Sequence, residues 1–304
     1  MKDHHSTLKG YFFALIYVLA LSNVYIFSKA ALKEVHIVQF GVYWFGLGLI
    51  WNLIFATKTC KKETIINLTR SKFFILGIIG LLEIVATTSF FTAIHIVENP
   101  AVVSFLGNIG PMFVITLGLI FLKERFNFLE LIGIVFILTG AFVISYTGSS
   151  NISEIFIKGT EYAILASLIF SIITIVVKKN ILTLPPALQS LNRAFFLFVF
   201  SFIMFLMLKQ SLFIAWKAFY NIAIGSVLGP FLTVVANYNA MKYIGAGRVS
   251  IFGSIKSLFV VAGTFIYFGI LPYNYQLAGG LLTILGVILI TGVKFLRNKR
   301  KESD

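Results

Sequence analysis

The chain is poor in charged residues and in cysteine. Only 12% of its 304 residues are charged, about half the share found in an ordinary soluble domain. The single cysteine, Cys60, excludes a disulfide framework and a metal site built from several cysteines. Of the four histidines, His4 and His5 lie next to each other near the N-terminus. The sequence therefore predicts neither a metal ion nor another cofactor.

Hydrophobic residues make up 59% of the chain. A soluble fold of this size could not bury so much apolar surface, and low charge with high hydrophobicity also excludes a disordered protein. The net charge of +14 would suggest nucleic acid in a soluble protein. In a membrane protein, basic residues instead mark the cytoplasmic ends of the helices. We therefore expect a protein embedded in a lipid bilayer that binds no nucleic acid.

The apolar residues are grouped into ten runs of about 20 residues, the length that spans a bilayer as a helix. The fold class expected is thus an all-α integral membrane protein. The ten predicted helices cover residues 11–31, 36–56, 73–94, 101–122, 129–146, 159–177, 190–208, 218–238, 249–268 and 275–295. The longest polar link, from Tyr146 to Lys158, divides them into two groups of five.

The basic residues indicate the orientation of these helices. With the N-terminus in the cytoplasm, 19 Lys and Arg residues fall on the inside, and five (Lys29, Lys33, Lys158, Lys209 and Lys217) fall on the outside. This asymmetry predicts that both termini are cytoplasmic. We expect a multi-pass protein of the plasma membrane, which is the inner membrane in a bacterium, and the chain could also pair with a second copy of itself.

The two halves of the chain are similar to each other. Matching positions include pairs of valine, phenylalanine and glycine: Val102 and Val249, Phe105 and Phe252, Gly133 and Gly279, and Gly140 and Gly286. Because each half has an odd number of helices, the halves enter the membrane in opposite senses, which is the architecture of many secondary transporters. We place the repeats at residues 9–147 and 157–294, followed by a basic cytoplasmic tail at 295–304.

One stretch resembles a known family. It reads FTAIHIVENPAVVSF over residues 91–105 and is followed by Gly110-Pro111, by FLKERF over 121–126 and by Gly140. This pattern is similar to the EamA type of the drug/metabolite transporter superfamily. The resemblance implies a transporter with a substrate cavity formed mostly by the first four helices of each half. The second half departs from the pattern, with Leu271-Pro272 where the first has Glu124-Arg125.

Two ionisable residues are expected at membrane depth, where a charge costs at least about 2.5–3.5 kcal/mol. Glu83 lies near the middle of the third predicted helix and Lys256 lies in the ninth. They could form an ion pair that locks one conformation. Alternatively, Lys256 could anchor an anionic substrate while Glu83 takes up and releases a proton. A structural interhelical contact, or a Lys256 side chain that reaches the surface, is the simpler interpretation.

Glycine and proline interrupt two of the predicted helices. Asn108 precedes Gly110-Pro111 in the fourth helix, and Gly229-Pro230 lies in the eighth. Proline lacks an N–H, so Pro111 leaves the carbonyl four residues back without its helical donor. Within a membrane such a carbonyl must be paired by protein, water or ligand. Asn108 is therefore a candidate substrate contact. The candidate gating hinges are Gly110, Pro111, Gly229 and Pro230.

Other polar and aromatic residues are candidate substrate contacts that could equally join helices to each other. They are Ser22 and Asn23 in the first helix, Ser104 in the fourth, Ser171 in the sixth, Asn237 in the eighth and Ser254 beside Lys256. Trp44 could stack on a substrate, although helix packing or lipid contact is the simpler interpretation. Arg193, near the start of the seventh predicted helix, is expected to contact lipid phosphates.

The function that these features favour is secondary transport of a small metabolite, such as an amino acid or an organic anion, by export or exchange. Proton coupling remains an option. The alternative is a flippase for a phosphate-bearing lipid carrier, with Lys256 or Arg193 at the phosphate. An intramembrane enzyme would need a cluster of catalytic groups, which one central Glu and dispersed histidines do not provide, so no enzymatic activity is expected.

Overall fold

The computed structural model describes residues 2–60, 68–122, 128–148, 156–181 and 183–303. Throughout these ranges the chain is helical apart from short links, and no strand is formed beyond an isolated antiparallel bridge between Tyr146 and Phe156. The expected all-α fold class is therefore confirmed. The part of the link between the halves that lies at 149–155 falls outside the described residues.

The helices follow the predicted spans closely, with two of the spans divided into shorter pieces. The first half contains α1 (Lys2–Leu32), α2 (Ile37–Thr59), α4 (Arg70–Ile96), α5 (Pro100–Leu106), the 3₁₀ helix η1 (Gly107–Ile109), α6 (Gly110–Leu122) and α7 (Phe128–Ser145). The second half contains α8 (Thr160–Asn180), α9 (Pro186–Met207), α10 (Trp216–Ser226), the π-helix η3 (Val227–Thr233), α11 (Val234–Phe268) and α12 (Asn274–Ser303).

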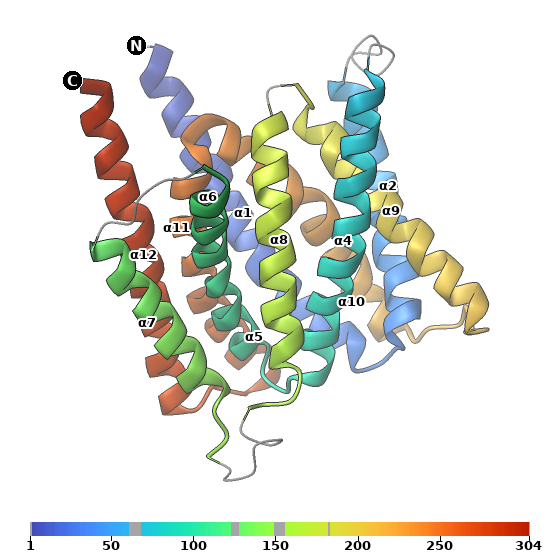
Figure 1. Cartoon of the computed structure of the whole chain (residues 1–304). Helices are drawn as coiled ribbons and strands as arrows, with labels where there is room; N and C mark the ends of the chain where they lie inside the picture. Colours follow the sequence, from blue (N-terminus) through green and yellow to red (C-terminus); the bar gives the residue numbers. More distant parts are fainter. Residues whose placement is uncertain (1, 61–67, 123–127, 149–155, 182, 304) are drawn as a thin grey trace.

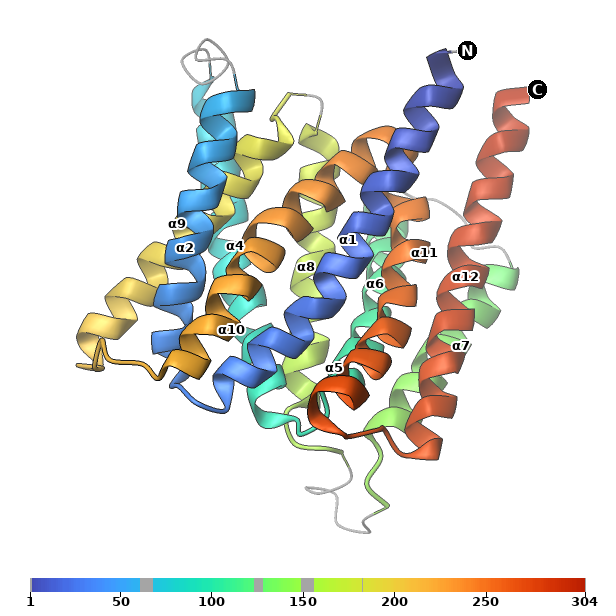
Figure 2. The same ribbon diagram turned by 180° about the vertical axis from the view of Figure 1, so that it is seen from behind.

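Six of the described helical segments are long and apolar enough to cross a membrane, and four further apolar segments are shorter. The shorter ones are Pro100–Val114, Leu131–Ser145, Phe252–Phe268 and Asn274–Leu289. The helices run side by side, and both chain termini lie at the same end of the bundle (Figure 1; Figure 2). The protein is thus a multi-pass membrane protein in which ten apolar segments form one bundle.

The breaks in the helices fall where glycine and proline predicted them. At η1 the chain tightens, so the N–H of Gly110 reaches the carbonyl of Gly107, the group that Pro111 deprives of its usual donor. Pro230 lies inside the wider turns of η3. Within α11, Gly245 has φ 78° and ψ 158°, a backbone conformation that only glycine adopts readily, and two helical pieces meet there at a kink.

The last helix of each half packs against its counterpart, α7 against α12, at one side of the bundle (Figure 1). Glycines permit this close contact: a Cβ on Gly140 would lie 2.5 Å from the carbonyl oxygen of Gly279, and one on Gly286 would lie 2.6 Å from that of Gly133. At the other side of the bundle α2 packs against α9. Between these pairs, α1 packs on α11 and α4 packs on α8, around the centre of the molecule.

Candidate functional site

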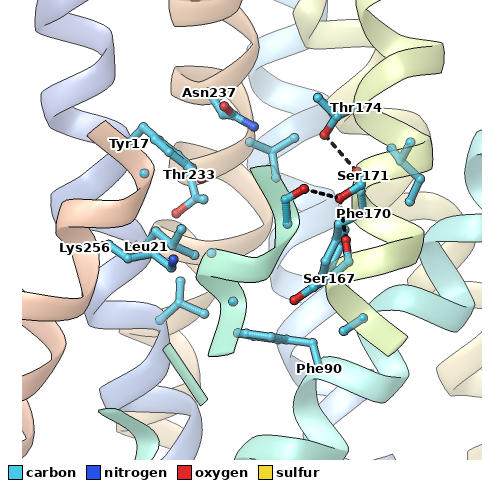
Figure 3. A pocket seen from close by; sticks show the side chains of 18 of the residues that line it. Tyr17, Leu21, Phe90, Ser167, Phe170, Ser171, Thr174, Thr233, Asn237 and Lys256 are labelled. Atoms are coloured by element: carbon cyan, nitrogen blue, oxygen red, sulfur yellow. Dashed lines mark hydrogen bonds between the residues drawn. The ribbon is translucent and has the colours of Figure 1, made fainter. Parts of the chain in front are cut away.

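A cavity of about 270 Å³ lies at the centre of the bundle. Its walls come from α1, α2, α4, α5, α6, α8 and α9, from the short segments η1 and η3, and from α11. Figure 3 shows Lys256, Thr233 and Asn237 on one wall, facing Ser167, Phe170 and Ser171 on the other. The rest of the lining is rich in aromatic side chains: Tyr17, Tyr25, Trp44, Phe45, Phe90, Phe91, Phe170 and Tyr238. A small solute with both polar and apolar parts fits such a chamber.

Lys256 brings a cation to the wall of this cavity. Its side chain is only 7% exposed, and its Nζ donates to Asn108 Oδ1 at 3.2 Å, the one hydrogen bond it makes among the described residues. An ammonium group has three donors, so two of them remain for water or a ligand. Gly107 lies opposite, where a Cβ would come within 3.6 Å of Nζ and 3.5 Å of the Tyr25 hydroxyl. The absent side chain leaves the space beside the ammonium group open.

Lys29 shows what a purely structural buried lysine looks like in the same protein. It is 4% exposed, and its Nζ donates to the carbonyl oxygens of Ile94, His95 and Val97 at 2.9, 3.0 and 2.7 Å. All three donors are used, and they pair the carbonyls at the C-terminal end of α4, which have no helical partner. Lys29 therefore fastens α1 to α4, whereas Lys256 retains donors that face the cavity.

Glu83 forms an ion pair with Arg193, which joins α4 of the first half to α9 of the second. Arg193 Nε lies 2.7 Å from Glu83 Oε2, and the two side chains are 13% and 3% exposed. Thr87 completes the contact, because its hydroxyl donates to Glu83 at 3.3 Å and accepts from Arg193 Nη2 at 3.1 Å. The expected contact of Arg193 with lipid phosphates is replaced by this pair, and Glu83 does not pair with Lys256 in this structure.

Arg193 lies deeper than the sequence predicted because α9 begins earlier. The span was expected from residue 190, but the helix starts at Pro186, where proline is well suited to the first helical position. Arg193 lies seven positions after Pro186, which is about 10 Å along a helix axis. The side chain therefore reaches the cavity wall and not the end of the helix.

Asn108 is the centre of a polar cluster at η1. Its Oδ1 accepts from Lys256, and its Nδ2 lies 3.4 Å from Ser257 Oγ and 3.2 Å from Thr283 Oγ1. Ser257 in turn donates to the carbonyl oxygen of Ser104 at 3.0 Å. The amide of Asn108 thus uses its donors to hold α11 and α12, and its oxygen orients the ammonium group of Lys256.

The π-helix is held by a polar contact that sequence reasoning missed. Asn52 of α2 is fully buried, and its Nδ2 donates to the carbonyl oxygen of Pro230 at 2.9 Å. Ser190 donates to Asn52 Oδ1 at 2.6 Å. The irregular backbone around Pro230 is therefore paired by protein at membrane depth, as a bilayer requires. The signal available in the sequence was a lone asparagine in the second predicted helix.

Trp44 is buried, at 1% exposure, and lines the cavity. Its indole ring lies over the glycines of α10 and η3: a Cβ on Gly225 would come within 2.0 Å of the ring, and one on Gly229 within 2.8 Å. The ring therefore packs against helix backbone, in agreement with the simpler interpretation of this residue. Gly229 and Pro230 also line the cavity.

Five further predicted residues line the cavity: Ser171, Asn237, Ser254, Gly110 and Pro111. Two of them are in contact, because Ser171 donates to the carbonyl oxygen of Gly110 at 2.9 Å.

Three other candidates lie outside the lining. Asn23 is exposed and donates to the carbonyl oxygen of Leu19, Ser22 donates to that of Lys256 at 3.2 Å, and Ser104 donates to that of Ala101. Thr233 was missed: it lines the cavity, is 8% exposed, and its hydroxyl has no partner among the described residues.

The fold and the cavity define a multi-pass membrane transporter built from two groups of helices. The EamA-like transporter family matches residues 8–146 and again residues 157–292. The chain therefore belongs to this family, a member of the drug/metabolite transporter superfamily.

Relatives and a solved structure agree with this assignment. An uncharacterized transporter of Methanothermobacter thermautotrophicus is 25% identical over 288 residues, which cover 88% of this chain and 80% of that protein. An uncharacterized transporter of Synechocystis is 23% identical over 253 residues, which cover 78% and 70%. A crystal structure with 14% identity superposes with a TM-score of 0.65 over 95% of this chain and 97% of its own, and so shares the fold.

Proposed function

We propose that this transporter moves a small metabolite with an anionic group, an organic anion or an amino acid, through the central cavity. Three charged residues line the cavity within the described chain: Glu83, Arg193 and Lys256. The first two neutralise each other at 2.7 Å, so Lys256 carries the unbalanced charge. An anionic group beside Lys256 would restore neutrality in a site where an isolated charge is costly.

The observation that carries this proposal is the unused hydrogen-bonding capacity of Lys256 beside open space. Its ammonium group keeps two donors, and Gly107 leaves room for a ligand next to them. A carboxylate placed there would accept charge-assisted hydrogen bonds, which are about twice as strong as neutral ones. The aromatic walls would contact the apolar part of the same solute.

Alternating access of two inverted repeats is the mechanism we propose, with both termini in the cytoplasm of a bacterial cell. The packing of α7 on α12 supports the inversion. In the sequence repeat, Gly133 corresponds to Gly279 and Gly140 corresponds to Gly286. In the structure the contacts are crossed: Gly140 lies against Gly279, and Gly133 lies against Gly286. A two-fold axis between the halves produces this crossed pattern. The two termini at one end of the bundle are compatible with it.

The proposal is tested in proteoliposomes with a panel of radiolabelled amino acids, mono- and dicarboxylates and their neutral amides. Lys256→Gln removes the charge, and Gly107→Ala fills the adjacent space at contacts of 3.5–3.8 Å, which the fold tolerates. Lys217→Gln, at a side chain 73% exposed, is the matched control. We expect uptake of an anionic solute that Lys256→Gln abolishes, that Gly107→Ala reduces and that the control retains. Unchanged uptake in Lys256→Gln contradicts the proposal.

A lipid-carrier flippase would give a different result in the same assay. None of the water-soluble panel would move, and translocation of a polyprenyl phosphate would depend on Lys256. The structure favours the soluble solute, because Lys256 is 7% exposed within a central cavity and Arg193 is already paired with Glu83.

A further inference from the structure

A second, smaller cleft lies between α2, α4 and α9 and has a volume of about 110 Å³. It shares two aromatic residues, Phe45 and Phe91, with the central cavity, which it does not otherwise join. Along α2 its lining extends from Phe45 to Ile37, the first residue of the helix. These nine residues extend over about 12 Å along the helix axis. Because α2 begins at the end of the bundle opposite the chain termini (Figure 2), the cleft extends along α2 from Phe45 to that end.

Four hydroxyl groups lie among the mainly apolar side chains that line this cleft. Thr87, Thr88, Thr92 and Ser201 all contribute to its walls. Within the described residues, the hydroxyls of Thr88, Thr92 and Ser201 make no hydrogen bond. A water molecule needs about 10–15 Å³ of such space and two or more polar partners. A cleft of about 110 Å³ has room for several waters, and the three hydroxyls without a hydrogen bond among the described residues supply polar partners for them.

At its inner end the cleft reaches Thr87, which contacts the Glu83–Arg193 pair. Thr87 lines the cleft, and the same hydroxyl donates to Glu83 Oε2 at 3.3 Å and accepts from Arg193 Nη2 at 3.1 Å. On the other side, Glu83 and Arg193 line the central cavity. The ion pair thus lines the central cavity and contacts the second cleft through Thr87.

We infer that the second cleft holds a chain of water molecules that brings protons to Glu83 by a route separate from that of the solute. A proton from this water adds to a Glu83 carboxylate oxygen and ends the charge pairing with Arg193. The proton then leaves for water in the central cavity, and Glu83 pairs with Arg193 again. The inference rests on the proposed function, because it assigns the coupling ion and its path to that same site.

The charged and titratable groups around Glu83 are compatible with this step. Arg193 of α9 pairs with it directly. The other described titratable side chains that line the shared cavity come from α1 and α11; they are Tyr17, Tyr25, Tyr238 and Lys256. The lining contributed by α2, α5 and α8 includes no titratable side chain. Arg193 is therefore the direct partner that protonation of Glu83 releases.

The presence of water in the cleft is tested by cysteine labelling, which needs no substrate. In a Cys60→Ser background, Thr92→Cys is reacted with a small charged methanethiosulfonate in liposomes. Val85→Cys is the matched control, because Val85 is 47% exposed on the same helix and lies outside the cleft. We expect labelling of Thr92→Cys at least ten times faster than that of the control. Ser201→Cys, which replaces one oxygen atom by sulfur, probes the cleft from α9. Equal labelling rates at positions 92, 201 and 85 overturn the inference.

The role of the cleft in coupling is tested with Thr92→Leu, which fills it at a residue outside the central cavity. Proteoliposomes that contain the pH dye pyranine are assayed with the radiolabelled panel. We expect accumulation driven by a pH gradient to fall at least fivefold, while solute exchange at equal pH stays within twofold. Undiminished gradient-driven accumulation overturns the inference. If no solute of the panel moves, the proposed function fails, and the labelling rates still decide whether the cleft is hydrated.

Discussion

The Glu83–Arg193 pair predicts a large and unequal response to single and double substitution. Glu83 is 3% exposed, and the pair is closed at 2.7 Å. Breaking a buried pair by removing one partner leaves an uncompensated charge and costs about 3–5 kcal/mol. We therefore expect Glu83→Gln and Arg193→Gln each to lower the free energy of unfolding by about that amount. The double variant keeps two amides that can bond to each other, and it should lie within about 2 kcal/mol of the wild type.

The measurement is reversible unfolding in mixed micelles with increasing dodecyl sulfate, followed by tryptophan fluorescence. The matched control is the ion pair between Lys217 and Glu34, closed at 2.9 Å but with a Lys217 side chain 73% exposed. Lys217→Gln should leave the unfolding midpoint unchanged, because solvent screens an exposed pair. If the losses from the two single substitutions at the buried pair simply add in the double variant, the two side chains do not interact and the account of the site is wrong.

Three further predictions use the same unfolding assay. Gly140→Ala places a methyl group 2.5 Å from a backbone oxygen of α12 and should lower the free energy of unfolding by about 1–3 kcal/mol. Gly77→Ala is the control, because its methyl group meets open space, and it should stabilise α4 by up to about 1 kcal/mol. A similar response at both positions would contradict the close packing of α7 on α12. Lys29→Met should cost about 1–3 kcal/mol for each carbonyl left unpaired. Lys33→Met is the control at an exposed lysine, and it should cost at most about 1 kcal/mol because it loses only the contact of Nζ with the Phe268 ring, 4.7 Å from the ring centre. Asn52→Leu removes the donor to the π-helix carbonyl and should destabilise by about 1–3 kcal/mol; wild-type stability would show that this carbonyl needs no partner.

The helices and the two central ionisable residues could be predicted from the sequence, because a bilayer requires long apolar runs and makes a charge within them conspicuous. Glycine and proline also marked both interrupted segments correctly. The sequence could not show that one break becomes a 3₁₀ turn and the other a π-helix, since Asn52 and Ser171 pair backbone carbonyls there from distant helices.

The partner of Glu83 could not be predicted for a related reason. Depth along a helix was estimated from where the apolar run begins, and α9 begins at Pro186, before that run. Arg193 therefore seemed to lie at the membrane surface. The sequence places Lys29 among the basic residues on the outer side of the membrane. Its three hydrogen bonds to carbonyl oxygens give it a structural role that only the folded chain reveals. Ser22 and Asn23 are neighbours in sequence, but their side chains point in different directions from the helix, so Ser22 is buried and Asn23 is exposed.

The most direct test of the central claim is a competition between two solutes that differ only in charge. The best-transported carboxylate of the panel and its carboxamide compete for the wild type and for Lys256→Gln. A hydrogen-bonded charge contributes about 1.5–3 kcal/mol, so the wild type should prefer the carboxylate by about 10-fold to 150-fold. Lys256→Gln should lose this preference. An equal preference for the carboxylate in both proteins would show that the anionic group binds elsewhere.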